Sequence, residues 1–492
     1  MTPPALRRVD TQTAFLSADA YWWRFCFLIL ALKFSLLALD PLPKLFMGDS
    51  GSYIWTALTG WIPEDRSYFY GYVIRWVALS TGSLTPLLLL QSFISALTAL
   101  LLAHTCRSLF GLSAGASYIL GFLCALDPFQ LVWERYVLTE TISLFFYVAV
   151  LYFSFLYLKH RGIWHLAIAQ GLSILLIGFR MSYLVIVQLN AIILPVFAFY
   201  PLLLEMWRRR RGPQGERFWP ARLAVVHLLT SIAMMLLLHG AYKQANGWLS
   251  HREPGYLYAT GLHLLVFWAP ILTPLDASDQ RLARIIEEGN EFDIKKLTAR
   301  NSQRWSPGYL IDRWEKVEPD RRRADEIAKE TALHALGRNP LQILRLDAQT
   351  FAQYWNLKDV RRYMRVDLGH NDLTPEQRSI LAERFHLATD GRIISAPRTI
   401  LQQYFFLSWP YCYFLLLSPI LGVSAVYLSR EKQLALFLLV HLVVILTVTL
   451  TFTVEPSFRY LQPVSVLTIL SIALCLRAFL NDGSSEKPAL SQ

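Results

Sequence analysis

The feature that most constrains the fold is a series of long apolar runs. About ten segments of roughly 20 residues contain few charged side chains, at 21–40, 85–106, 113–131, 139–158, 162–179, 182–204, 222–241, 402–428, 433–453 and 459–480. A hydrocarbon core about 30 Å thick requires about 20 apolar residues per helical span. With 54% hydrophobic and 17% charged residues, the composition excludes an ordinary soluble domain. We therefore expect an all-α integral membrane protein with about ten transmembrane helices.

The distribution of Lys and Arg among the connections between these runs predicts the orientation. If the N-terminus is cytoplasmic, basic residues occur in every cytoplasmic segment: Arg7 and Arg8, Arg107, Lys159 and Arg161, the arginines at 208–211 with Arg217 and Arg222, Arg430 and Lys432, Arg477 and Lys487. Short cytoplasmic loops retain positive charge. Both termini are therefore expected in the cytoplasm. The net charge of +11 then fits topology and anionic lipid headgroups, and nucleic acid is not an expected partner.

Two long outside segments divide the chain into three parts. Residues 1–241 form an N-terminal seven-span module that includes the first outside segment, 41–84. Residues 242–401 form a large outside segment with amphipathic helices, and 402–492 form a three-span module with a cytoplasmic tail. Juxtamembrane helices in the two outside segments either cap the bundle or roof a cavity, and the pattern leaves both alternatives open.

Within the large outside segment, two local patterns predict specific structures. The apolar stretch 258–276 is interrupted by Gly261, Pro270 and Pro274, which favours a segment lying along the membrane or dipping into it over a full span. Further on, the pair Asn339–Pro340 predicts a break between two helices.

The first outside segment contains the strongest candidate for chemistry. Asp49 stands in MGDSGSY directly after the first apolar run, and Gly48 and Gly51 allow the backbone to turn tightly there. A carboxylate at the membrane–water boundary can accept a proton from a hydroxyl group or hold a divalent cation. A helix cap or a solvated loop acid is the alternative interpretation.

Asp65 and Arg66 follow in PEDRSYFYGY. They are suited to pair with each other, but a guanidinium group is also suited to bind a phosphate oxygen. The tyrosines and phenylalanine that follow are typical of an interfacial aromatic belt, and they also suit the lining of a sugar or isoprenoid site.

Five further outside residues are ionisable or aromatic candidates. Glu134 and Glu140 lie in WERYVLTETISLFF, and Glu140 begins an apolar run, where ionisable groups are costly and often functional. A helix N-terminus also favours an acid, so capping is an alternative for Glu140. Arg180 marks a tight hairpin, and Arg459 with Tyr460 precedes the last run. Each arginine is placed either to reach lipid headgroups or to bind a lipid phosphate.

Nucleotide-binding and zinc-protease motifs are absent. The sequence contains no G-x-G-x-x-G, phosphate-binding P-loop or H-E-x-x-H pattern. Acids, arginines and aromatics instead gather at one membrane face. Together they suggest the handling of a lipid-anchored phosphate.

These motifs resemble the polytopic glycosyltransferases of the GT-C class. GDSGSY, PEDRSYFYG, WERYVLTETISLFF, GRNPLQILRLDAQTFAQYW and FRYLQP are similar to segments of its bacterial members, relatives of protein O-mannosyltransferases and aminoarabinose transferases. The resemblance covers nearly the whole chain and includes the layout of a seven-span core with two long outside segments. Ser50 stands where the mannosyltransferase-like pattern has a second acid, so the sequence does not establish a metal requirement.

The resemblance implies a GT-C fold, a bacterial inner-membrane location and transfer of one sugar, with inversion, from a polyprenyl-phosphate donor to a periplasmic acceptor. Asp49 is then the general base. Arg66, Arg180 and Arg459, with Tyr460, bind the phosphate, and Asp65, Glu134 and Glu140 position the acceptor or a cation. The acceptor is a glycan, a lipid or a protein. The sequence establishes no cofactor and leaves a divalent cation open.

Two other functions compete with this one. A polysaccharide polymerase or ligase would use a diphosphate-linked glycan and several outside arginines. A transporter should show ionisable residues near mid-membrane and helices interrupted in paired halves. The sequence shows neither transporter feature clearly.

Overall fold

The protein is helical throughout the part that the structure describes. The computed structural model describes residues 20–208, 214–369, 373–387 and 399–482. Within these ranges the elements are helices, and an isolated bridge joins Lys44 to Tyr136. The basic residues noted at 7, 8, 209–211 and 487 lie outside the described residues.

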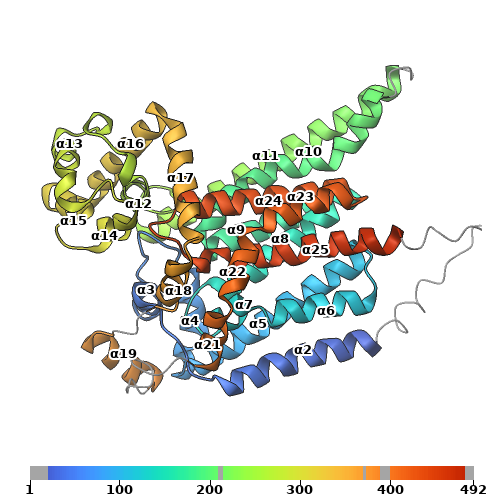
Figure 1. Ribbon diagram of the computed structural model, residues 1–492, viewed down its shortest axis with the longest axis horizontal. Coiled ribbons are helices and arrows are strands. Elements are labelled where there is room, and N and C mark those ends of the chain that lie inside the picture. The colour runs from blue at the N-terminus through green and yellow to red at the C-terminus, as the bar shows by residue number, and fades with distance from the viewer. Residues whose placement is uncertain (1–19, 209–213, 370–372, 388–398, 483–492) are drawn as a thin grey trace, which may run out of the picture.

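Among the residues that the structure describes, seven helices, some together with an adjoining short turn, are long and apolar enough to cross a membrane. They are α2 (Ala20–Leu39), α5 (Thr85–His104), α8 (Glu140–His160), α10 (Leu184–Arg208), α11 (Gln214–Ser250), α24 (Lys432–Thr451) and α25 (Gln462–Asp482). They run alongside one another as a bundle (Figure 1). The expectation of a multi-pass membrane protein is confirmed at this level.

The other three predicted spans differ from single long helices. The helices α6 (Ala114–Ala125) and α9 (Ile163–Phe179) are apolar but shorter, and α6 turns into α7 (Pro128–Trp133). The run 402–428 is divided into α21 (Ile400–Leu407), α22 (Trp409–Leu416) and α23 (Ser418–Leu428), with a bend of 48° between α22 and α23. Pro410 and Pro419 stand at the starts of α22 and α23, where a missing N–H is tolerated. The count of ten spans therefore stays a prediction.

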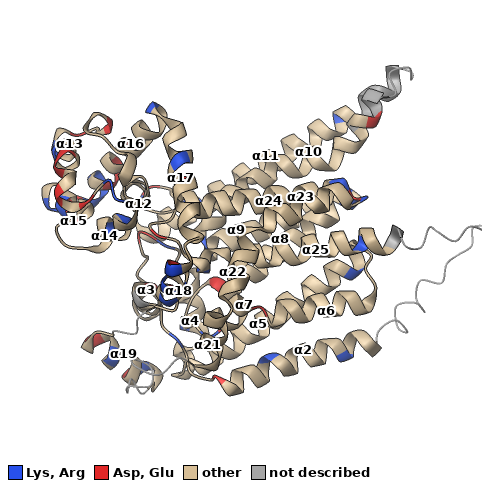
Figure 2. Cartoon of the chain, in the orientation of Figure 1, with Lys and Arg blue, Asp and Glu red and all other residues tan. Residues whose placement is uncertain are grey.

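The connections expected in the cytoplasm meet at one end of the bundle. Glu431, before α24, lies 3.3 Å from Lys159 at the end of α8 and 2.8 Å from Arg477 near the end of α25. Lys159 also donates to the carbonyl oxygen of Leu109, after α5. Figure 2 shows that charged residues are sparse along the bundle and gather at its two ends and in the outside segments.

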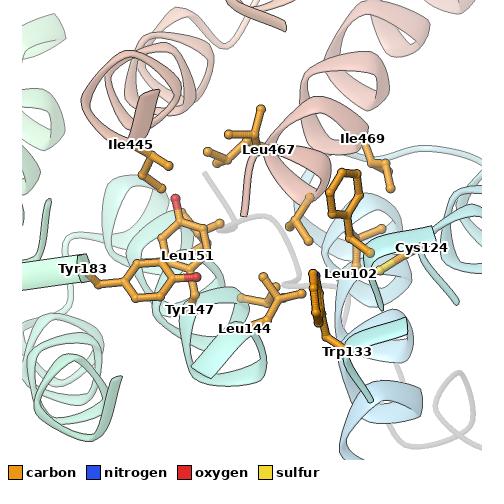
Figure 3. Packing of buried hydrophobic residues seen from close by; sticks show 14 of the residues in the cluster. Leu102, Cys124, Trp133, Leu144, Tyr147, Leu151, Tyr183, Ile445, Leu467 and Ile469 are labelled. Atoms are coloured by element: carbon orange, nitrogen blue, oxygen red, sulfur yellow. The ribbon is translucent and has the colours of Figure 1, made fainter. Parts of the chain in front are cut away.

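The helix α8 lies at the centre of the core. Leu144 and Leu151 of α8 belong to the same buried cluster as Leu102 of α5 and Leu467 of α25 (Figure 3). Among the seven candidate spans α8 is the most buried and α11 the least, so most of α11 is left to face lipid. Burial of α8 places its first residue, Glu140, inside the protein.

The first outside segment forms two packed helices, α3 (Met47–Thr59) and α4 (Phe69–Val77), followed by the short turn η1 (Leu79–Thr81). They cross closely at Gly71, where an added Cβ would lie 2.5 Å from the Thr56 side chain. A glycine is required there because any side chain would push the helices apart.

The described part of the large outside segment contains eight helices, and α11 extends to Ser250, past the predicted boundary at 241. They are α12 (Thr260–Phe267), α13 (Gln280–Glu287), α14 (Arg300–Trp305), α15 (Leu310–Val317), α16 (Arg321–Arg338), α17 (Pro340–Tyr354), α18 (Leu357–Asp367) and α19 (Pro375–Phe385), with short 3-10 turns η4 to η7 among the first of them. The predicted break is confirmed, since Asn339 separates α16 from α17.

The prediction that 258–276 lies along or dips into the membrane is wrong. Leu262 and Leu265 of this stretch are buried in a separate core of the outside segment, together with Trp314 and Ala328. An added Cβ at Gly261 would lie 1.9 Å from the backbone oxygen of Asp325, so α12 and α16 are in close contact. The stretch is apolar because α16 and its neighbours cover it, which its own sequence does not reveal.

Candidate functional site

Asp49 lies in the first turn of α3, where a carboxylate is favoured by the positive end of the helix dipole. The predicted tight turn is wrong, because Gly48 and Gly51 are both helical. The start of α3 is fixed by Ser50, whose hydroxyl donates a hydrogen bond to the carbonyl oxygen of Val137 at 2.9 Å. This contact ties the first outside segment to the connection that leads into α8.

The Asp49 carboxylate lies between two guanidinium groups. One oxygen accepts from Nη1 of Arg66, and the other accepts from Nη1 of Arg459 at 2.9 Å. The Asp49 side chain is 25% exposed. Burial raises the pKa of this carboxyl, but the charges and hydrogen bonds of Arg459 and Arg66 outweigh burial, so the pKa lies below its usual value.

The ion pair extends on both sides into a chain of alternating charges. Asp65 accepts from Nε and Nη2 of Arg66 at 3.0 and 2.8 Å. On the other side, Nε of Arg459 donates to Oε1 of Glu140, and Nη1 of Arg180 lies 3.3 Å from the same oxygen. Three carboxylates and three guanidinium groups thus form one continuous network, which we call the Asp49 network.

Aromatic rings flank two of the arginines in this network. The Arg180 guanidinium lies over the ring of Tyr460 at 5.2 Å, and the Arg459 guanidinium lies over Phe46 at 4.5 Å. An aromatic face attracts a cation and limits its orientation without using its N–H donors. The N–H groups at the edges of the two guanidinium planes therefore remain available to carboxylates or to an anionic ligand.

The network leaves several polar atoms without a hydrogen bond. Nη1 of Arg180 is within ion-pair distance of Glu140, but no hydrogen-bond geometry is met. Oε2 of Glu140 and the hydroxyl of Tyr183 are also buried and unsatisfied among the described residues. Buried polar groups without partners are rare and call for an explanation, which a bound ligand or ordered water would supply.

The structure brings together seven of the eight residues proposed from the sequence. They are Asp49, Asp65, Arg66, Glu140, Arg180, Arg459 and Tyr460. Glu134 lies elsewhere, completely buried at the end of α7, where it pairs with Lys33 of α2 at 3.1 Å and Arg135 at 3.2 Å. A buried lysine requires a counter-ion, and Glu134 supplies it.

Three residues close to this network carry no sequence signal that singles them out. His263 and Arg304 of the large outside segment lie near enough to Asp65 to act on its charge. Burial raises the pKa of Asp65, but the hydrogen bonds and charge of Arg66 outweigh burial. With the smaller effects of His263 and Arg304, the pKa of Asp65 lies below its usual value. The third residue, Asp367 of α18, contacts the backbone of Arg459. Their positions depend on tertiary packing, and no motif spacing marks them.

An open pocket of about 560 Å³ lies between α3 and α19. It is lined by Gly48, Gly51 and Trp55 on α3 and by Leu381 on α19. These α3 residues lie on a different face of the helix from Asp49, which points toward Arg459. Asp49 does not line this pocket.

Two further polar groups lie inside the bundle. His441 of α24 contacts the hydroxyl of Tyr147 at 2.8 Å and Oδ1 of Asn190 at 3.0 Å. Lys33 is buried in the ion pair with Glu134 described above. Ionisable residues at such positions are often functional.

Among the described residues, no group of three or more His, Cys, Asp or Glu side chains is arranged to hold a metal ion. Both oxygens of Asp49 face guanidinium groups instead. Comparisons with protein-family models, with curated proteins and with solved structures returned no match to the chain.

Proposed function

We propose that the protein is an inverting glycosyltransferase that moves one sugar from a polyprenyl-phosphate donor to an acceptor hydroxyl. The observation that carries the proposal is the Asp49 network, in which a candidate base lies between arginines contributed by segments far apart in the chain. It is supported by the motif resemblance to GT-C enzymes. The proposal includes a bacterial inner membrane, cytoplasmic termini, and a site on the periplasmic side.

The arginines are the groups that would bind the donor phosphate. Arg180 has a buried nitrogen without a hydrogen bond, and Arg459 contacts both Glu140 and Asp49. A phosphate that enters between them would receive charge-assisted hydrogen bonds and would compete with the carboxylates. When Arg459 turns to the phosphate, Asp49 loses a positive neighbour, its pKa rises, and it becomes a stronger base.

Transfer then proceeds in one displacement. The acceptor oxygen forms a bond to the anomeric carbon of the sugar while the bond from that carbon to the phosphate oxygen breaks on the opposite face. The acceptor proton passes to Asp49, and the phosphate leaves with the electron pair. Arg180 and Arg459 stabilise the charge that develops on the phosphate, a type of interaction that often supplies the largest part of catalysis.

The transporter alternative gains one observation. The structure places Lys33 and His441 inside the bundle, although the sequence did not clearly indicate ionisable residues at mid-membrane. Both have protein partners, Glu134 for Lys33 and Tyr147 for His441. Uptake of a labelled solute by reconstituted vesicles, abolished by Lys33→Met and not by Asp49→Asn, would favour transport over transfer.

Purified protein and a synthetic polyprenyl-phosphate sugar test the proposal. We expect transfer of labelled sugar to acceptors extracted from the cell envelope, and loss of transfer in Asp49→Asn. Turnover of a diphosphate-linked glycan, with none of the monophosphate donor, would instead establish a polymerase or ligase. Mass analysis of envelope glycans and lipids after gene deletion would identify the acceptor.

A further inference from the structure

The connection that carries Arg459 is held by the large outside segment. This connection, residues 453–461, joins α24 to α25 and includes the short turn η8 (Phe458–Leu461). Asp367, the last residue of α18, accepts from the Ser457 hydroxyl at 2.6 Å with one carboxylate oxygen. Its other oxygen accepts from the backbone N–H groups of Phe458 and Arg459 at 2.7 and 3.1 Å.

A second side chain from the outside segment holds the same residues. The hydroxyl of Tyr354, at the end of α17, donates to the carbonyl oxygen of Ser457 at 3.1 Å and accepts from its N–H at 2.9 Å. The Tyr354 ring packs edge-on against Phe458, with ring centroids 5.3 Å apart. Arg300 of α14 donates to the carbonyl oxygen of Thr453 at 2.9 Å.

These contacts fix the backbone from which the Arg459 side chain extends to Asp49 and Glu140. Asp367 is only 3% exposed and Tyr354 is completely buried, so neither contact is a solvent-exposed pairing. The carboxylate also caps the start of η8, where backbone N–H groups lack partners within the helix. A displacement of 1 Å in a catalytic group can reduce a rate about 100-fold.

We propose that Asp367 is a positioning residue that sets the place of Arg459, so that the outside segment, and not the membrane helices alone, determines the geometry of the Asp49 network. The effect of this positioning on sugar transfer rests on the proposed function. The effect on the structure is independent of that function, because the 453–461 connection should loosen without Asp367 whatever reaction the protein catalyses.

Hydrogen–deuterium exchange of the full-length protein measures this directly. In Asp367→Ala, we expect amides of 453–461 to exchange about tenfold faster or more, since the three hydrogen bonds to the carboxyl group are lost. Tyr354→Phe removes one hydroxyl from the same connection and should accelerate exchange in the same peptide. Asp276→Ala is the matched control, because Asp276 is equally buried in the outside segment but pairs with Arg338.

A dependence on pH separates positioning by the carboxyl group from packing alone. Burial raises the pKa of Asp367 to about 7, despite its hydrogen bonds to Ser457, Phe458 and Arg459. A carboxyl with a raised pKa favours the closed connection while it is protonated, and this advantage is lost as pH rises from about 4 toward 7. The titratable groups that act with it are Arg459, Tyr136, Tyr354 and Cys412, of which only Arg459 is charged at neutral pH.

Asp367→Asn keeps the shape of the protonated acid but cannot titrate. After correction for intrinsic exchange, protection of 453–461 in the wild type should fall as pH rises from 5 to about 7, and in D367N it should stay constant.

With a polyprenyl-phosphate sugar as donor, we expect D367A to lose about tenfold or more in transfer and D367N to retain most of it. Unchanged exchange of 453–461 in both D367A and Y354F would overturn the proposal, even if wild-type transfer is observed. Absence of transfer in a wild type whose connection loosens in D367A would reject the glycosyltransferase function and leave the positioning contact in place.

Discussion

Arg459→Lys is the most informative single substitution for the proposed reaction. Arg459 uses two different nitrogens, Nε toward Glu140 and Nη1 toward Asp49 at 2.9 Å. A lysine keeps the positive charge but has a single ammonium group, which cannot reproduce this fixed two-sided geometry. The substitution therefore tests bridging geometry and leaves net charge unchanged.

The magnitude follows from the loss of one aligned donor. Removal of a single donor that stabilises transition-state charge typically raises the barrier by about 3 kcal/mol, which corresponds to a rate about 100-fold lower. Single-turnover transfer from a saturating polyprenyl-phosphate sugar measures this step directly. A rate for R459K within about threefold of the wild-type rate would refute the two-sided role of Arg459.

Arg477→Lys is the matched control. Arg477 also pairs with a glutamate, Glu431, at 2.8 Å, but at the opposite end of the bundle and with 29% of its side chain exposed. Partly exposed ion pairs contribute about 0–1 kcal/mol. R477K should therefore leave the transfer rate within a few-fold of the wild type.

Three further predictions follow from the same contacts. Asp49→Asn should reduce transfer by about 100-fold or more in a protein that still unfolds cooperatively on heating at pH 7; equal transfer in both proteins would remove Asp49 from catalysis. Because the pKa of Asp49 lies below its usual value, its stabilising contribution is present above about pH 4 and is lost as pH falls further. Acid titration of thermal unfolding should show this loss in the wild type and not in D49N. Lys33→Met should lower the free energy of unfolding by about 3 kcal/mol, because it leaves the buried Glu134 paired with Arg135 and without Lys33. A double-mutant cycle checks the coupling: K33M should cost less stability in the Glu134→Gln background than in the wild type.

The local chemistry of the sequence predicted much of the architecture. Apolar length indicated the membrane helices, and the pair Asn339–Pro340 indicated a helix break that the structure confirms. The division of 402–428 was not predicted, although Pro410 and Pro419 mark the places where α22 and α23 begin. Apolar length and the backbone restrictions of proline depend on neighbouring residues, so spans and helix breaks can be predicted from the sequence without knowledge of the fold.

The apolar stretch 258–276 shows where this reasoning fails. Its hydrophobicity and its prolines are compatible with contact to lipid or with contact to protein, and the sequence gives no direct measure of which one occurs. In the structure Leu262 and Leu265 pack against Trp314, about 50 residues later in the chain. Partners so distant in sequence are selected by shape complementarity in the folded core.

The sequence by itself determined that this chain is a multi-span helical membrane protein with acids and arginines placed near the ends of its apolar runs. Only the tertiary structure decided which of them meet: Asp49 pairs with Arg459, 410 residues away, whereas Glu134 turns into the bundle toward Lys33. The same is true of Asp367, whose contact with the connection at 453–461 no motif indicated. The physical reason is that apolar runs and helix ends depend on neighbouring residues, while a buried charge takes whichever counter-ion the packed helices bring within reach.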